Sequence, residues 1–94
     1  MTDQVLHEPE RSRYVLDRDG EVIGLADYRV ANGAIQITHT EVDPSLRGQG
    51  LGSVLVRGVL DQIRVDTDSA VVPICPFVDD WIELHPAYQD LLTR

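Results

Sequence analysis

The segment Arg47-Gly48-Gln49-Gly50-Leu51-Gly52 decides how this chain folds. A β-type stretch, residues 34–42, precedes it, and an amphipathic stretch, residues 53–65, follows it. A strand that passes through glycines into a helix makes an anion site, because the first N–H groups of the helix have no partner inside the helix and the helix dipole adds partial positive charge there. Glycines also let the backbone approach a bulky phosphate. We therefore expect a ligand that carries phosphates, in particular a pyrophosphate.

Two common phosphate-binding motifs do not fit this segment. A nucleotide-triphosphate P-loop needs a lysine after its last glycine, and all 8 basic residues of this chain are arginine. A dinucleotide fingerprint needs G-x-G-x-x-G at the first strand of a repeated βαβ unit. Here the third required position is Ser53, and the segment lies in the middle of the chain. We favour neither interpretation.

What remains is R-x-x-G-x-G preceded by V-x-P, and the residues that fill this pattern are Val42, Pro44, Arg47, Gly50 and Gly52. The pattern resembles the acyl-CoA-binding signature of the GCN5-related N-acetyltransferase (GNAT) superfamily. The resemblance runs from about Arg13 to the C-terminus and is to the short, single-domain members of unassigned substrate. It includes residues 39–42, 72–78 and 85–88.

The resemblance implies an acetyl-CoA-dependent N-acetyltransferase that moves an acetyl group to an unidentified amine of a small molecule or a protein. Larger members of the superfamily carry N-terminal helices that build the acceptor pocket, and here a meander takes their place, so the acceptor site is open or completed by a partner. One alternative is a non-catalytic CoA or acyl-CoA-binding module that acts as a sensor or subunit. Another is a structural interaction protein that has lost the ligand, although the intact glycine segment argues against it.

The predicted fold is α/β (α+β) and GNAT-like in a minimal form: an antiparallel meander, a strand–glycine loop–helix–parallel strand unit, and a C-terminal helix. We expect a flexible tail over residues 1–11 and a single domain over residues 12–94. Turn signals at Asp19-Gly20 and Asn32-Gly33 separate the strands of the meander. The expected strands are 13–17, 22–31, 34–42 and 70–75, the last parallel to 34–42, and the expected helices are 53–65 and 77–85, with one more helical turn over 87–92.

The composition of the chain limits which kinds of molecule it can bind and where in the cell it can work. The net charge of −8 argues against nucleic acid, because phosphate contacts need clustered basic residues. The chain has no apolar run long enough to cross a membrane and only 1 cysteine, which suits a reducing compartment. We expect a cytoplasmic protein, a monomer or weak homodimer, with no metal site.

The resemblance also implies which residues hold coenzyme A. Backbone groups of Glu41 and Val42 would hydrogen-bond the pantetheine arm, and the loop and first helical turn would hold the pyrophosphate. The residues expected there are Arg47, Gly48, Gln49, Gly50, Leu51, Gly52 and Ser53. Arg47 and Arg57 are the nearest positive charges for the 3′-phosphate.

Three side chains are candidates for the chemistry. Cys75 ends a strand expected beside the pantetheine arm and precedes a helix N-terminus, which favours thiolate, so it is a candidate acetyl acceptor with His39 as its base. Glu41 is a candidate base for the amine. Each has a simpler interpretation: a buried cysteine acting as a small hydrophobe, a histidine packed in the core or facing solvent, and a solvated carboxylate that contributes only its backbone.

The chain departs from the superfamily at one further point. Many members have a tyrosine in the last helix that protonates the leaving thiolate, and here Ile82 occupies that position, with Tyr88 later in the chain. Phe77 and Trp81 fall on the apolar face of this helix, which predicts core positions; an aromatic wall for the acceptor is the alternative.

Overall fold

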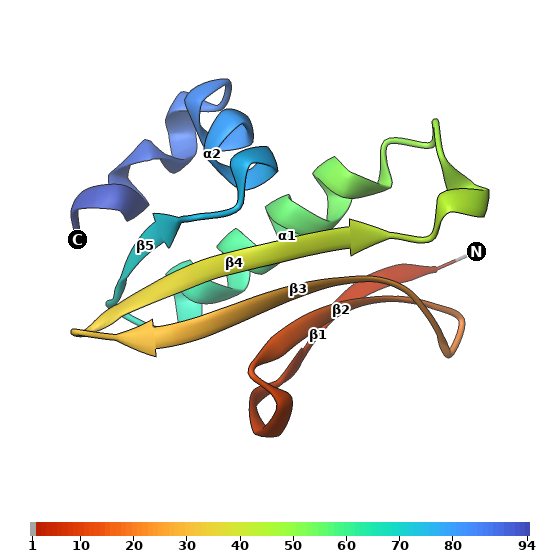
Figure 1. The fold of residues 1–94 in the computed structure, drawn as a ribbon, viewed down its shortest axis with the longest axis horizontal. Helices are drawn as coiled ribbons and strands as arrows, with labels where there is room; N and C mark the ends of the chain where they lie inside the picture. The colour runs from red at the N-terminus through yellow and green to blue at the C-terminus, as the bar shows by residue number, and fades with distance from the viewer. Residues whose placement is uncertain (1) are drawn as a thin grey trace.

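A computed structural model describes residues 2–94. Its five-stranded sheet has the order β1-β2-β3-β4-β5, and the first four strands form an antiparallel meander (Figure 1). Helix α1 packs against β1 to β4, whereas α2 and the 3₁₀ helix η3 pack against β5. The strands are β1 (Asp3–Glu8), β2 (Arg13–Arg18), β3 (Glu21–Ala31), β4 (Ala34–Val42) and β5 (Ala70–Pro73), and the helices are η1 (Pro9–Arg11), η2 (Pro44–Leu46), α1 (Leu51–Asp66), α2 (Pro76–Glu83) and η3 (Pro86–Thr93).

Both predicted hairpin turns are confirmed. Asp19 and Gly20 have φ of 52° and 92°, and Asn32 and Gly33 have φ of 55° and 75°. Two successive residues with positive φ make a type I′ turn, whose twist matches that of the strands on either side. Local residues therefore determine the register of the meander.

Helix α1 forms because its apolar residues recur on one face. Leu55, Val59 and Ile63 are each no more than 1% exposed, and they face the core together with Leu51, Val56 and Leu60. The helix extends slightly beyond the predicted range at both ends. None of the helices in residues 2–94 is long and apolar enough to cross a membrane.

Strand β5 pairs parallel to β4, as predicted, but only along the first half of β4. The paired register runs from Ala34–Ala70 to Ile37–Pro73 and stops there. One further hydrogen bond joins the Cys75 N–H to the Ile37 carbonyl at 2.9 Å. Residues 38–42 of β4 thus continue beyond the last pair with β5. The predicted strand over 70–75 was too long at its C-terminal end.

The structure differs from the predicted flexible tail over residues 1–11. Residues 3–8 form β1, which pairs with β2 from Asp3–Arg18 to Glu8–Arg13. Ion pairs at both ends of this register, Arg18 with Asp3 and Arg13 with Glu8, hold the edge strand. Val5 packs against Gly58 of α1, and the Gln62 side chain donates to the Val5 carbonyl. Strand β1 contacts a helix that lies far along the chain: Val5 and Gln62 are 57 residues apart. The polar sequence around β1 therefore does not reveal that this segment is a strand.

The contact between Val5 and Gly58 is testable by mutation. A Cβ at position 58 would lie 2.3 Å from Val5 Cγ2, so Gly58→Ala forces β1 away from α1. We expect this to lower the free energy of unfolding by about 1–3 kcal/mol, partly offset by the roughly 1 kcal/mol that alanine contributes to helix propensity. In a Val5→Ala background the cost of Gly58→Ala should shrink by at least about 1 kcal/mol in urea unfolding. An equal cost in both backgrounds would contradict the packing.

Candidate functional site

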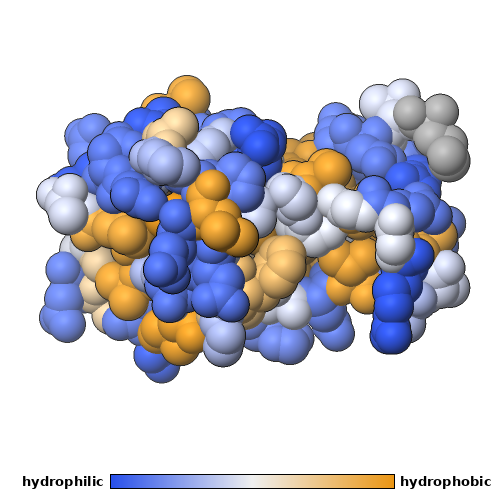
Figure 2. Space-filling view, turned by 90° about the horizontal axis from the view of Figure 1, so that it is seen from above, coloured by the Kyte–Doolittle hydropathy of each residue, from blue (hydrophilic) through white to orange (hydrophobic). Residues whose placement is uncertain are grey.

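A groove of about 530 Å³ lies between the end of β4, the glycine loop (residues 47–50), the first turn of α1 and the start of α2. In Figure 2, apolar surface is visible in the hollow between two polar masses. The groove is lined by Thr40, Glu41, Val42, Leu46, Arg47, Gly48, Gly50, Leu51, Gly52, Ser53, Leu55 and Phe77. Of the β4, loop and α1 residues predicted to bind the cofactor, all but Gln49 are in this set, and Arg57, named for the 3′-phosphate, lies instead over the rings of Trp81 and Tyr88. The side-chain oxygen of Gln49 instead accepts a hydrogen bond from Arg18 at 3.4 Å.

The three glycines of the motif serve two different purposes. Gly48 and Gly50 have φ of 88° and 72°, in the left-handed region that side chains disfavour. Gly52 lies within α1, and a Cβ there would come within 2.9 Å of Phe77 Cζ. The first two glycines therefore allow the loop conformation, and the third allows α2 to approach α1.

The start of α1 presents unpaired donors to the groove. Gly50 occupies the N-cap position and has no side chain to cap the helix. The first hydrogen bond of the helix joins the Val54 N–H to the Gly50 carbonyl at 3.3 Å. The N–H groups of residues 51–53 precede that bond, so they have no acceptor within the helix and are free to bind an anion.

Asp43 fixes the entry to the loop. Its Oδ1 accepts hydrogen bonds from the Ser45 N–H at 2.9 Å and the Ser45 hydroxyl at 2.8 Å, which caps η2. These bonds lower the pKa of Asp43 below its ordinary value of 3.8. The Asp43 N–H donates to the Ile23 carbonyl at 2.8 Å and ties the same residue to β3.

A bulge in β4 decides which side chains face the groove. Asp27 pairs with His39 and Tyr28 with Ile37, so Thr38 is the extra residue on β4. A single extra residue reverses the alternation of side chains between the two faces. Ile35 and Ile37 face the core before the bulge, and Thr40 and Val42 take the inner side after it. His39 and Glu41 are turned outward.

Cys75 lies beside this inner side of β4. It is 7% exposed and occupies the N-cap position of α2. Its Sγ is 3.4 Å from Thr40 Oγ1. Burial pushes the pKa of the thiol up, but hydrogen bonds from the Thr40 side chain and from the backbone N–H groups of Val78, Phe77 and Thr40 outweigh it, so the pKa lies below its ordinary value.

Comparisons with known proteins agree with this geometry. The family model described as "GCN5-related N-acetyl-transferase" matches residues 13–91. The chain belongs to this family. It is also similar to the solution NMR structure of a GCN5-like protein from Staphylococcus aureus, whose own assignment as an N-acetyltransferase is a proposal. That match has a TM-score of 0.69 and 27% identity, and it covers 94% of this chain and 85% of the other. A search of curated protein sequences gives no significant match.

The membership confirms the predicted GNAT-like fold and the enzyme class, N-acetyltransferase. The side chains that the structure brings together, and those that it keeps apart, bear on which residues of this GNAT protein carry out the chemistry.

The predicted pairing of Cys75 with His39 is corrected by the structure of this GNAT protein. The thiol contacts Thr40, and the bulge turns His39 to the opposite side of β4. His39 lies instead near Glu41, with Nε2 3.9 Å from Oε2 and side-chain exposures of 58% and 61%. Thr40 is the residue that sequence reasoning missed. In a regular strand counted from Ile37, the side chain of Thr40 would point away from the core, and the bulge at Thr38 is what turns it toward the groove.

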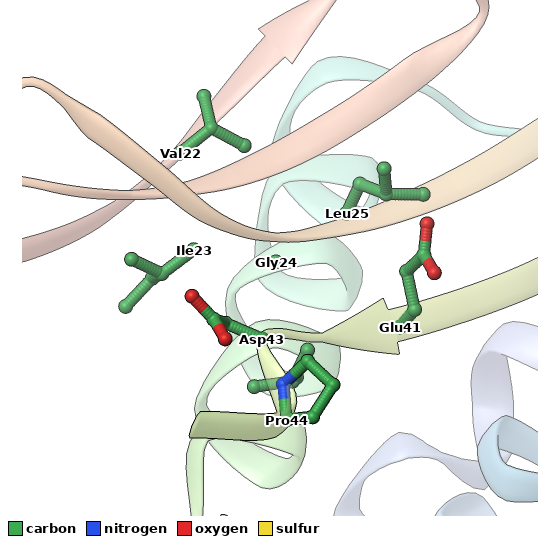
Figure 3. A pocket seen from close by; sticks show the side chains of 8 residues that line it. Val22, Ile23, Gly24, Leu25, Glu41, Asp43 and Pro44 are labelled. Carbon is green, nitrogen blue, oxygen red and sulfur yellow. The ribbon is translucent and has the colours of Figure 1, made fainter. Parts of the chain in front are cut away.

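The carboxylate of Glu41 lies outside the groove. A hollow of about 200 Å³ occupies the other side of β4 and shares Glu41 and Val42 with the groove. In Figure 3 the Glu41 side chain extends toward Leu25 of β3. Glu41 thus presents its backbone to the groove and its carboxylate to the outer face.

The C-terminal aromatic residues support α1. The Trp81 indole donates to Ser53 Oγ at 2.8 Å, and Trp81 is 5% exposed, which confirms its predicted core position. Phe77 is 46% exposed and lines the groove, so the prediction that it lies in the core was wrong. The Tyr88 hydroxyl donates to Asp61 at 2.8 Å, and Arg57 lies over the Tyr88 ring at 5.8 Å. Tyr88 is thereby held along α1 and does not replace the missing tyrosine beside the thiol.

The cap formed by Asp43 predicts a pH dependence. A carboxylate whose pKa is lowered on folding stabilises the fold above its unfolded-state pKa, and this stabilisation is lost as the pH falls through the lower folded-state pKa. We therefore expect the free energy of unfolding to fall less between about pH 5 and about pH 3 in Asp43→Asn than in the wild type, as measured by chemical denaturation. Asp68→Asn, in the exposed loop before β5, should behave as the wild type. Identical pH profiles for all three proteins would argue against the cap.

Proposed function

We propose that this protein transfers the acetyl group of acetyl-CoA to an amine by way of Cys75. The observation that carries the proposal is the contact between the Cys75 thiol and the groove: Sγ lies 3.4 Å from the hydroxyl of Thr40, which lines the groove. A thiolate is the nucleophilic form of cysteine, and this hydroxyl stabilises it by donating a hydrogen bond.

The groove supplies a place for each part of the co-substrate. The free N–H groups of residues 51–53 would receive the pyrophosphate, and the left-handed glycines let it approach the backbone. The backbone of residues 40–42, which β5 leaves unpaired, would hydrogen-bond the amides of the pantetheine arm. The exposed ring of Phe77 gives that arm an apolar wall. Binding at these remote positions would direct the thioester toward Cys75.

The proposed transfer has two steps. In the first, the Cys75 thiolate attacks the carbonyl carbon of acetyl-CoA, a new C–Sγ bond forms, and the bond to the CoA sulfur breaks. CoA leaves as a thiolate and takes up a proton from solvent, equivalent to the one that the Cys75 thiol released. In the second step a neutral amine attacks the same carbon, the C–N bond forms, and the C–Sγ bond breaks to restore the Cys75 thiolate. The nitrogen then loses a proton.

His39 and Glu41 are assigned to the acceptor. Both side chains are exposed on the outer face of β4, so they can accept a proton from an approaching ammonium group without contacting the thiol. An aliphatic amine is protonated near neutral pH and must lose a proton before it attacks. The acidic character of the chain, with a net charge of −8, attracts such a cation.

Intact mass measurement tests the covalent route. Incubation with acetyl-CoA should add one acetyl group to the wild type and none to Cys75→Ala. Because Cys75 is the only cysteine, a single thioester adduct identifies its site. The adduct should be released by hydroxylamine and by an aliphatic amine acceptor. Binding of CoA without an adduct or turnover would instead support the non-catalytic binding module.

A second measurement tests the binding site itself. Gly50→Glu places a carboxylate where the pyrophosphate is proposed to bind and should weaken CoA binding at least about tenfold in calorimetry, because like charges repel. Gly33→Glu is the matched control: Gly33 has a similar positive φ of 75°, and a Cβ there also meets nothing within 4 Å. Equal loss of affinity in both variants would place the CoA site elsewhere.

A further inference from the structure

The sulfur of Cys75 lies between β4 and the start of α2. The hydroxyl of Thr40 approaches it from β4, with Oγ1 3.4 Å from Sγ. Cys75 is the N-cap residue of α2, and its side chain makes no capping hydrogen bond to that helix. The Thr40 hydroxyl is therefore the hydrogen-bonding group that reaches the sulfur across the space between β4 and α2.

The end of the β4–β5 pairing leaves space beside β4 for the Cys75 side chain. Strand β5 leaves β4 after Pro73, and the Cys75 N–H then donates to the Ile37 carbonyl. Beyond this bond the Cys75 sulfur lies next to the Thr40 hydroxyl. The bulge at Thr38 turns the Thr40 hydroxyl to the same side.

We propose that Thr40 is a positioning residue for Cys75, whose hydroxyl donates to Sγ and holds the thiolate ready for attack on an acyl thioester. The inference rests on the proposed function, because a thiolate held in this way has a role only if Cys75 accepts the acyl group. A hydroxyl bound to a thiolate can only donate, since the thiolate has no proton to give. The β-branched side chain of Thr40 has few rotamers, so its Oγ1 is held in place at little entropic cost.

The charged side chains on the elements around Cys75 do not explain why the pKa of its thiol is lowered. On β4, His39 and Glu41 are turned to the outer face by the bulge, and on α2, Asp79 and Asp80 are exposed. The residue of α1 that faces this end of the groove is apolar Leu55. Within residues 2–94, the side chain that hydrogen-bonds the sulfur is therefore the uncharged Thr40.

The proposal is tested by the pH dependence of Cys75 alkylation with iodoacetamide, in the absence of CoA. Thr40→Val removes the hydroxyl but keeps the branched shape, and it should raise the midpoint of the alkylation profile by about one to two pH units, from the usual strength of a hydrogen bond to a charged group. Thr40→Ser keeps the hydroxyl and should stay within about half a unit of the wild type. At pH values above both midpoints, wild type and Thr40→Val should react at similar rates, which a general loosening of the fold would not produce.

Two controls keep the outcomes distinct. Far-ultraviolet circular dichroism and urea unfolding verify that each variant folds, and Thr40→Ala provides a second hydroxyl-free variant if Thr40→Val does not. An unchanged midpoint in a folded hydroxyl-free variant overturns the role of Thr40. A shifted midpoint in a protein that acetyl-CoA does not acetylate leaves the hydrogen bond established, but it refutes the covalent function and with it the catalytic purpose of Thr40.

Discussion

The separation of β4 from β5 after the Ile37–Pro73 pair is the constraint on which the rest of the site depends. Up to that pair the two strands share a parallel ladder, and beyond it β4 continues to Val42 without β5, paired with β3 on its other side. The backbone groups of β4 that lose their strand partner become available to other partners. Thr40 lies in this part of β4 with its hydroxyl 3.4 Å from the Cys75 sulfur, and its neighbours line the groove. Without this separation neither the groove nor the surroundings of the thiol would exist.

The bulge at Thr38 divides the chemistry of β4 between two faces. Inward, Thr40 and Val42 meet the groove and Cys75; outward, His39 and Glu41 meet solvent and each other. A regular strand would have reversed this arrangement and set the two ionisable residues beside the thiol. The bulge thus places an uncharged hydroxyl beside the thiol and leaves the two ionisable side chains on the outer face. In the proposed reaction both bond-forming steps take place at Cys75, and only the deprotonation of the incoming ammonium group is assigned to the outer face.

Much of the fold is predictable from the sequence, because near neighbours determine it. The Asp19-Gly20 and Asn32-Gly33 turns depend on residues that tolerate positive φ, and the stripe of α1 depends on spacing along a single helix. The groove was predictable for the same reason, since glycine loop and helix start are contiguous. The sequence does not predict three other features: strand β1, the bulge, and the contact between Thr40 and Cys75. Each depends on a partner far along the chain, as with Val5 and Gly58, or on an extra residue in a register that no local pattern marks.

The glycine motif itself combines local and distant requirements. Gly48 and Gly50 allow the positive φ angles of the loop, whereas Gly52 leaves room for the tip of the Phe77 ring. The next residue, Ser53, is held by the indole of Trp81 from the same helix, α2. The first turn of α1, which presents its N–H groups to the groove, therefore contacts two side chains of α2. Since Cys75 is the N-cap residue of α2, this turn and the thiol are both joined to one short helix, and a shift of α2 would move both together.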